Sequence, residues 1–576
     1  MKALKLLPLA MILALAMVFA LACSSADDED DDAPSTSAAQ PTVAPAMTQP
    51  TAAPEHTTMG GTVKVVGHAG TFTFVDPHAT GLIMTGFVGR QVYEQLFTRD
   101  GEFNVRPQLV EEWSTNSDST VWTFKLREGK MFHNGDPLRV EDVIESIKRN
   151  AVLSSISRSY YRGFSGKESV GDVQADIEHM FAKVDDTTLT VTLDKPSSYI
   201  LTIMAQIDPF MPSVMHEEIY KNPAGGKGDE ATKTAIGTGP FKFDEWVPGR
   251  GVFLSRNDEF LARDEPNDFL FGELEVLVDK QEVLVIADHA ARGAALQTGE
   301  VHFLDDFKLD VAKTLEGDPN IQVQRVGRMN MGTTNWNQWK EPFNNPKVRQ
   351  AVAIALPIDR IMTAAIGDSE WWQQCAFYIH CGTKWSEGAQ GYGDQYQSIS
   401  GDAERAAAIV EAEGVKGQHV RIISVDSTFI PEAALVIRET LEGIGFTAEI
   451  LAVDTAASGE MQRAPEPTNW EMSMGWSNFF NGVDPLGPHT NSYTKGRYDS
   501  YWQDPGDRAQ TIRTKFAEEL DFAKQVELTR QYDELYWEEW PRNVAMFSNP
   551  RAYRTDVLEG VGNWLYPLVY GVSVKQ

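Results

Sequence analysis

The stretch VWTFKLREGKMFHNGDPLRVEDVIESIKR, residues 121–149, carries the clearest structural pattern in the chain. Apolar and polar residues alternate at its start, which is typical of a strand with one buried face. Asn134-Gly135 then predicts a tight turn. Residues 141–149 space their apolar side chains as a helix does. The stretch therefore predicts a strand, a turn and a helix, and it favours a mixed α/β protein.

The rest of the chain continues this mixture without a repeat of fixed period. In the first half the patterns predict strands at 60–67, 187–195, 274–279 and 301–305, a hairpin over 241–258, and helices at 86–97 and 285–299. In the second half they predict helices at 347–362, 402–414, 432–445 and 521–539, and strands at 419–426, 447–454, 470–476 and 543–548. Asn345 and Pro346 suit the N-cap and first position of the helix over 347–362. Residues 60–576 exceed what one hydrophobic core usually holds, so we expect at least two lobes.

The N-terminus has the parts of a secretory signal. Two lysines lie within the first five residues, and residues 6–22 are almost all apolar. Ala20-Leu21-Ala22-Cys23 resembles the lipobox of bacterial lipoproteins, in which the cysteine is acylated and becomes the first residue of the mature protein. We therefore expect residues 1–22 to be a signal peptide and Cys23 to carry the lipid. Plain secretion with a chance cysteine is the alternative.

Residues 23–59 predict a tether rather than a folded segment. Six consecutive acids, Asp27 to Asp32, are followed by a tract rich in Ala, Pro, Thr, Ser and Gln without apolar periodicity. Such a composition cannot offset the entropy lost on ordering. As a flexible coil, this segment would hold the following domain roughly 35 Å from a membrane surface.

The charge of the chain argues against nucleic acid as a partner. The formal net charge is −31, and a body this acidic repels a phosphate backbone. Beyond the signal no apolar run approaches the length of a membrane span, so we expect a protein body outside the bilayer.

Two further cysteines, Cys375 and Cys381, lie close together in WWQQCAFYIHC. In an exported protein an isolated close pair predicts a disulfide bond. A metal site that enlists His380 is the alternative, but no fourth ligand is evident. We therefore predict no bound metal and no cofactor.

Catalytic motifs are not apparent. The sequence holds no nucleophile elbow, zincin helix, paired Cys-x-x-Cys or Walker phosphate loop. Aromatic residues instead gather after predicted strands, in the stretches 333–339, 371–378 and 475–488. Ligands of α/β proteins collect at the carboxyl ends of strands, so these stretches are candidates for a binding site. Packing of the same rings in the core or at a hinge is the alternative.

Four ordered stretches give a specific resemblance. Residues 92–149, 236–246 (IGTGPFKFDEW), 296–306 (LQTGEVHFLDD) and 343–360 (FNNPKVRQAVAIALPIDR) resemble signatures of the extracellular solute-binding proteins of family 5. That family comprises receptors of peptide, nickel and related ABC importers. The matches follow the family order across almost the whole body.

The resemblance implies a two-lobed periplasmic-binding-protein-like α/β fold of type II, in its large cluster with an extra subdomain. Residues 60–328 would form lobe I, 329–543 lobe II, and 544–576 a return to lobe I. Two crossing strands would form the hinge, near Gln322–Met331 and Arg542–Asn549.

The resemblance also implies the ligand-binding residues. Those predicted are Tyr93, Asn335, Trp336, Trp476, Phe479, Phe480, Asn481 and Asp484. In peptide binders of the family an aspartate, three residues past the Gly-Trp tryptophan, pairs with the α-ammonium of the peptide. The matching position here is Phe479, which argues against a strict di- or oligopeptide ligand. A shifted loop in which Asp484 takes over this role is the alternative.

We therefore expect a non-catalytic, monomeric, lipid-anchored substrate-binding subunit of an ABC importer, located outside the cytoplasmic membrane. It would capture a small organic solute, peptide-like or related, between its lobes and deliver it to permease and ATPase partners. A surface-anchored hydrolase with an unrecognised site and a solute-sensing co-receptor are the alternatives.

Overall fold

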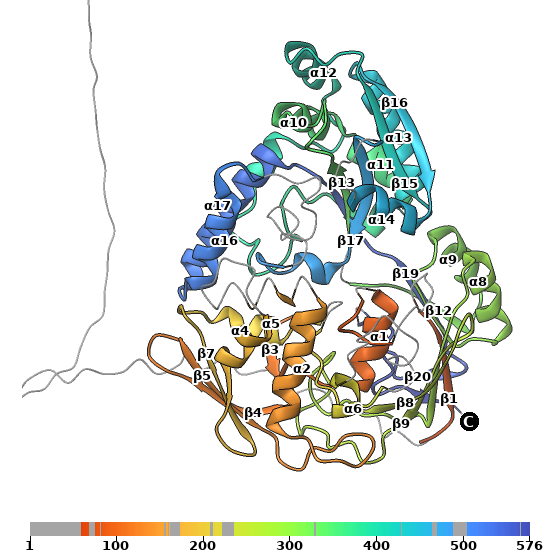
Figure 1. The fold of residues 1–576 in the computed structure, drawn as a ribbon. Helices are drawn as coiled ribbons and strands as arrows, with labels where there is room; N and C mark the ends of the chain where they lie inside the picture. Colours follow the sequence, from red (N-terminus) through yellow and green to blue (C-terminus); the bar gives the residue numbers. More distant parts are fainter. Residues whose placement is uncertain are drawn as a thin grey trace, which may run out of the picture. The chain divides into compact units, whose positions relative to one another are not determined.

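The computed structural model describes residues 59–67, 75–80, 82–154, 157–158, 161, 173–207, 211–221, 235–327, 330–427, 429–463, 469–487, 504–564 and 566–575. Cys23 and the tether therefore lie outside the described residues. The described strands form two large sheets and three smaller ones, with helices packed around them (Figure 1).

The first large sheet has seven strands in the order β12-β19-β11-β1-β10-β9-β8. Its strands are β1 (Thr62–Val66), β8 (Phe241–Val247), β9 (Gly251–Arg256), β10 (Lys280–Leu284), β11 (Phe303–Asp305), β12 (Ile321–Arg325) and β19 (Pro550–Arg554). The central β1 runs parallel to β10 and β11, and the outer pairings are antiparallel. Helix α8 (His289–Thr298) connects β10 to β11 and lies within the helix predicted over 285–299.

The second large sheet has six strands in the order β14-β18-β13-β17-β15-β16. Its strands are β13 (Asn330–Trp336), β14 (Trp372–Gln373), β15 (His419–Val425), β16 (Thr447–Val453), β17 (Met472–Ser477) and β18 (Asn543–Phe547). Helices α10 (Pro346–Ala355), α11 (Ile358–Ala365), α12 (Ala403–Ala412) and α13 (Ile430–Gly443) share one hydrophobic core with this sheet. Asn345 caps α10 by accepting a hydrogen bond from the Lys347 backbone N–H, as predicted.

The stretch 121–149 forms part of a four-stranded subdomain, as its pattern predicts. The sheet order is β4 (Val110–Thr115), β5 (Val121–Leu126), β7 (Thr188–Thr192) and β6 (Phe181–Lys183). Helix α2 (Val140–Leu153) packs beside α4 (Val173–Met180). The inward residues of β5 and α2, among them Phe124, Val143 and Ile147, are buried in one cluster. Local periodicity thus fixed both the elements and their buried faces.

The other described elements are helices, short 3-10 helices and the strands of two two-stranded sheets. They are α1 (Ile83–Val92), β2 (Phe97–Arg99), β3 (Val105–Pro107), α5 (Tyr199–Met204), α6 (Glu217–Tyr220), α9 (Leu309–Leu315), η1 (Ser369–Trp371), η2 (Tyr392–Gln395), α14 (Thr455–Arg463), η3 (Phe479–Gly482), η4 (Pro505–Asp507), α16 (Arg508–Glu518), α17 (Phe522–Glu539), β20 (Leu558–Glu559) and β21 (Ser573–Val574).

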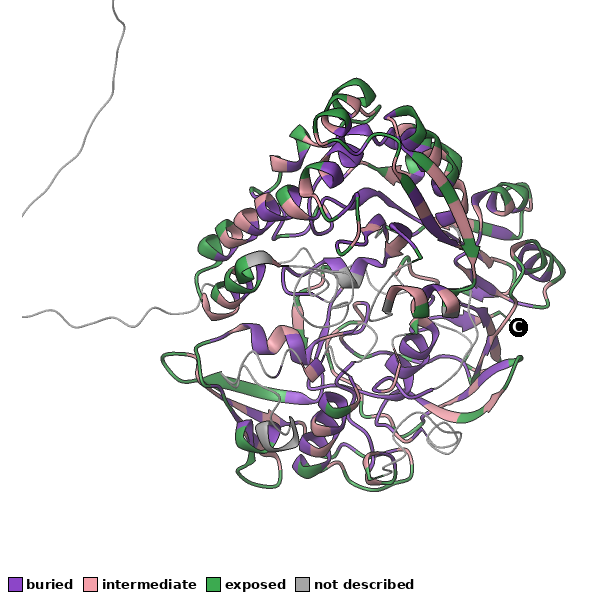
Figure 2. Cartoon of the chain, turned by 45° about the horizontal axis from the view of Figure 1, so that its top comes forward, coloured by how far each residue is buried: buried purple, intermediate pink, exposed green. Residues whose placement is uncertain are grey.

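The chain passes between the two large sheets twice. The first passage lies between β12 and β13, and the second between β18 and β19. We call the body around the seven-stranded sheet and its four-stranded subdomain lobe I, and the body around the six-stranded sheet lobe II. The predicted mixed α/β fold with two lobes is confirmed. Figure 2 shows buried residues in the interior strands and on one face of many helices, whereas the edge strands β4 and β16 are mostly exposed or intermediate.

Three predicted elements are wrong in their extent. The helix predicted over 86–97 ends at Val92, because the Val92 carbonyl accepts a hydrogen bond from the Gly239 N–H instead of continuing the helix. The helix predicted over 347–362 is two helices, because Pro357 has no N–H and disfavours a helical residue before it. The strand predicted over 274–279 is not one: Leu274 has φ +44°, and the ladder with β1 begins at Lys280.

Candidate ligand site between the lobes

A cavity of about 290 Å³ lies where a loop of lobe I meets two loops of lobe II. Lobe I contributes Arg99, Glu102, Phe103 and Asn104, and lobe II contributes Gly382, Thr383, Lys384, Trp385, Glu387, Phe479, Val483 and Asp484. Acids, bases and aromatic rings line the same space. Such a lining suits a polar solute with charges of both signs.

An ion pair joins the lobes at this cavity. Arg99 Nη2 lies 2.9 Å from Asp484 Oδ2, and both side chains are less than one tenth exposed. Arg99 also donates to the backbone carbonyls of Phe103 and Ala205 at 2.8 and 3.2 Å, so lobe I holds its guanidinium. Asp484 already has a cationic partner within the chain. This geometry argues against the alternative in which Asp484 pairs with a ligand ammonium.

Aromatic contacts continue the junction beside the ion pair. The Phe479 ring lies 4.8 Å from that of Phe103 and 5.3 Å from that of His380, centroid to centroid. Phe479 is only 3% exposed, so it serves as a buried contact between the lobes rather than an open wall. The His380 N–H donates to the Gly482 carbonyl at 3.0 Å, which ties the loop after β17 to the segment around Cys381.

Cys375 and Cys381 form a disulfide bond. The segment that they close carries His380, which packs directly against Phe479. The disulfide therefore restrains the segment that supports the loop of the candidate site.

We expect the double substitution Cys375→Ser and Cys381→Ser to lower the free energy of unfolding by about 2 kcal/mol, because closing so short a loop removes little chain entropy. Urea unfolding, monitored by tryptophan fluorescence, measures the change. A thiol reductant should shift the wild-type curve by a similar amount and leave the double variant unchanged. An unchanged wild-type curve under full reduction would contradict this role.

His380 is fully buried, and burial lowers its pKa to about 4. Because the unfolded chain takes up this proton near pH 6.5 and the folded chain only near pH 4, the free energy of unfolding falls as the pH drops through that interval.

We expect His380→Asn to reduce the pH dependence of stability between pH 4.5 and 6. The slope of the unfolding free energy should decrease by about 1.4 kcal/mol per pH unit, which corresponds to one proton. Urea titrations of both proteins at several pH values measure the two slopes. Equal slopes would show that His380 titrates normally in the fold.

Asn335 lies on the face of the six-stranded sheet that is shared with Thr333, Ser473 and Gly475. Asn335 pairs with Ser473 and Thr333 with Gly475 in the β13–β17 ladder. The Asn335 amide donates to Ser473 Oγ at 3.2 Å, and its oxygen accepts from Arg542 Nη1 at 2.8 Å. Asn335 and Gly475 are half-buried, so part of this polar face remains accessible.

Trp336 and Trp476 lie on the opposite face, because successive strand residues point to opposite sides. Trp336 is fully buried against Phe343, and its indole N–H donates to the Pro541 carbonyl at 3.0 Å. Trp476 is half-buried, and its indole N–H donates to Ser427 Oγ at 3.1 Å. The structure therefore does not bring these two rings together with Asn335. Trp336 packs in the core. This is the alternative that the sequence analysis gives for the aromatic stretches.

Tyr93 also lies in a core rather than at the cavity. It follows α1 directly, is 3% exposed, and belongs to the core of lobe I. Burial raises the pKa of its phenol above the ordinary value. The backbone of Phe480 and Asn481 lies in η3, but their side chains fall outside the described residues. Among the six predicted ligand residues whose side chains the structure describes, Phe479 and Asp484 line the cavity, and Tyr93, Asn335, Trp336 and Trp476 do not.

Sequence reasoning missed the lobe I loop of the site. Arg99 is a lone base at the end of a short strand and precedes the turn at Asp100-Gly101. Because ligands of α/β proteins bind near the carboxyl ends of strands, this position of Arg99 could have marked it as a candidate site residue. The lobe II segment 382–387 follows Cys381, and its role was visible only in the tertiary structure.

The lining residues that the structure describes include no serine, cysteine or histidine. In the described part of the chain, no three His, Cys, Asp or Glu side chains are arranged to hold a metal ion. None of the described helices is both long and apolar enough to cross a membrane.

Comparisons with known proteins agree on one family. The family described as bacterial extracellular solute-binding proteins, family 5 Middle, matches residues 104–500. A probable peptide ABC transporter periplasmic-binding protein of Sinorhizobium fredii is 28% identical and covers 86% of this chain and 91% of its own. A glutathione-binding protein of Escherichia coli is 23% identical, over 83% of this chain and 87% of its own.

Solved structures share the fold. The ABC transporter-associated periplasmic binding protein DppA from Helicobacter pylori, in complex with the peptide STSA, superposes with a TM-score of 0.72. Its sequence identity is 20%, and the match covers 90% of this chain and 99% of that one.

Proposed function

Because the chain belongs to the bacterial extracellular solute-binding proteins of family 5, we propose that it is the substrate-binding subunit of an ABC importer. It captures a small organic solute between its lobes and delivers it, unaltered, to a membrane permease that an ATPase drives. The relatives named as peptide-binding and glutathione-binding proteins support a peptide-like solute.

The observation that carries this proposal is the cavity built by loops of both lobes. A solute held there contacts both lobes only while they are together. Its binding free energy therefore favours the closed arrangement over an open one, and this difference drives closure. The two passages of the chain between the sheets supply the hinge. We place it at Gln322–Met331 and Arg542–Asn549, with the lobe boundaries at residues 328 and 543.

The charges of the site support a restricted class of solutes. Phe479 stands where the peptide binders carry an aspartate, and Asp484 is paired with Arg99. A free α-ammonium would therefore meet no unpaired carboxylate from either position. We propose a peptide-like solute whose amino terminus is modified or held by other groups, and we retain the polar face around Asn335 as a second contact region.

A binding screen tests the function. Thermal-shift measurements against peptides, N-acylated peptides, glutathione conjugates and sugars identify a solute by its stabilisation of the folded protein. X-ray scattering with and without that solute should show a change in radius of gyration, and mass spectrometry should recover the solute intact. Chemical conversion of the solute would replace this function with an enzymatic one.

Cys23, in its lipobox-like context, supports membrane anchoring. We propose that the mature protein is a monomer that begins at a diacylated Cys23 and stands off the membrane on residues 24–59. The acidic and proline-rich composition of this segment supports an unstructured spacer.

We expect Cys23→Ser to release the protein from the membrane fraction, because one or more acyl chains are lost and nothing else predicts insertion. Solute binding should be unchanged, since the binding lobes lie beyond the tether. Fractionation with detection of the protein in medium or periplasm measures release, with Cys375→Ser and Cys381→Ser as a control that keeps the lipid. Continued membrane attachment of the Cys23 variant would reject the anchor.

A further inference from the structure

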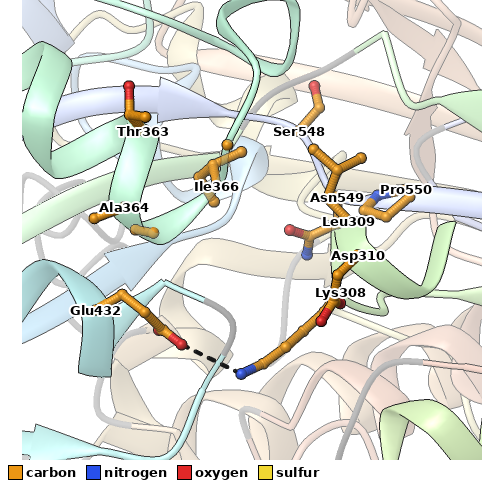
Figure 3. Close-up of a pocket in the computed structure, with 12 residues that line it drawn as sticks. Lys308, Leu309, Asp310, Thr363, Ala364, Ile366, Glu432, Ser548, Asn549 and Pro550 are labelled. Carbon is orange, nitrogen blue, oxygen red and sulfur yellow. Dashed lines mark hydrogen bonds and ion pairs between the residues drawn. The ribbon is translucent and has the colours of Figure 1, made fainter. Parts of the chain in front are cut away.

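A second cavity, of about 220 Å³, lies at the hinge. Its walls are residues 308–310 of lobe I, residues 363–367 and Glu432 of lobe II, and residues 548–550, which link β18 to β19 and include the first residue of β19. It shares no lining residue with the cavity around Arg99. Figure 3 shows Thr363 and Ala364 on one side and Leu309 and Asn549 on the other.

The polar atoms that face this hinge cavity are mostly hydrogen-bond acceptors. Glu432 Oε2 has no hydrogen-bond partner among the described residues, and the Glu432 side chain is about one third exposed. Asn549 Oδ1 also has no hydrogen-bond partner among the described residues. The amide nitrogen of the same side chain donates to Asp306. These two oxygens have no donor within the described chain, so they are available to accept hydrogen bonds from a ligand that brings N–H groups.

The charged groups of the hinge cavity also favour a ligand that donates hydrogen bonds. Asp310 and Glu432 line the cavity with one base, Lys308. The cavity also meets residues 363–365, the C-terminal turn of α11, where the helix carries partial negative charge. The electrostatic environment therefore favours a cation.

Lys308 is the cation nearest to Glu432, but its ammonium group does not make a close contact with the carboxylate. Its Nζ lies 3.4 Å from Glu432 Oε1, beyond the usual 2.7–2.9 Å range of charge-assisted hydrogen bonds. Both side chains are about one third exposed. Figure 3 shows the contact between them as a dashed line. A small ligand cation could approach Glu432 more closely than the tethered lysine does.

We propose that this hinge cavity is a second binding site, for a small organic ammonium or guanidinium ion. The cavity, of about 220 Å³, has room for a compact cation. Because the walls belong to both lobes and to the hinge, rotation of the lobes changes the separation of the contacting groups. A ligand held by all three binds one interlobe angle better than others and shifts the population toward it. The site thereby couples a second solute to opening and closing.

Calorimetric titration of the full chain tests the site, with methylguanidinium as the probe and the neutral isostere methylurea as its control. We expect saturable binding of methylguanidinium and none of methylurea. Glu432→Gln should weaken binding about tenfold or more, because a charge-assisted hydrogen bond is lost. Glu439→Gln is the matched control, since Glu439 lies on the same helix but pairs with Arg360 on the exposed surface.

Lys308→Ala distinguishes a cation site from an anion site. Removal of the competing lysine should tighten methylguanidinium binding severalfold. X-ray scattering of the solute-free protein should also change on saturation with methylguanidinium. No saturable binding, equal binding to Glu432→Gln, or weaker binding to Lys308→Ala would each overturn the proposal. These measurements need no importer solute, so they are independent of the proposed function.

Discussion

Asp484→Asn should open the protein and weaken solute binding on the order of a hundredfold, with only a small loss of thermal stability. The substitution leaves Arg99 without its anionic partner in a buried contact between the lobes. Breaking a buried pair from one side costs about 3–5 kcal/mol when the remaining charge stays buried. Here the lobes can separate and let water reach Arg99, so the cost appears in the opening equilibrium rather than in unfolding.

Scattering of the solute-free variant measures the opening, and titration with the solute from the screen measures affinity. Lys195→Gln provides a matched control. Lys195 and Glu518 also join the lobes, at 2.6 Å, but both side chains are more than one third exposed. An exposed pair contributes about 1 kcal/mol at most, so affinity should change less than tenfold. Equal effects of both substitutions would show that the Arg99–Asp484 pair has no special role in closure.

Gly482→Ala should reduce solute affinity at least about tenfold and lower the free energy of unfolding by about 1–3 kcal/mol. A Cβ at this position would lie 2.0 Å from His380 Nδ1 and 2.4 Å from His380 Cε1. The histidine ring cannot move freely, because it is fully buried and packed against Phe479. The added methyl group therefore displaces the loop that carries Phe479 and Asp484.

Gly443→Ala is the control for loss of a glycine. Gly443 ends α13, and a Cβ there would meet no atom within 4 Å. Alanine is favoured over glycine in a helix, so this variant should be as stable as the wild type or slightly more stable. Urea unfolding and solute titration compare the two variants. Wild-type affinity in Gly482→Ala would show that the loop does not contribute to the site.

Much of the fold follows from the sequence because strands and helices depend on near neighbours. The alternation of 121–126 and the spacing of 141–149 sufficed for β5 and α2. The predicted strands and helices of lobe II have counterparts at nearly the same residues, except where Pro357 divides one helix in two. That exception was also readable, since proline interrupts helices for a local reason.

The candidate site was predicted less well, because it depends on which sides of the strands and loops come together in the folded chain. The resemblance implies both Asn335 and Trp336 as ligand residues, yet adjacent strand residues point to opposite sides of a sheet. Trp476 joined Trp336 on the buried side through the register of β17 with β13. Ring chemistry alone does not tell a ligand-facing aromatic residue from one in the core.

The sequence by itself determined the acidic two-lobed α/β body, its family, the close cysteine pair and the presence of a loop after β17. The tertiary structure decided that Asp484 pairs with Arg99, that Phe479 packs between the lobes, and that a second cavity forms at the hinge. The reason is separation along the chain. Periodicity is set by residues a few positions apart, whereas Arg99 and Asp484 are 385 residues apart and meet only after both lobes have formed.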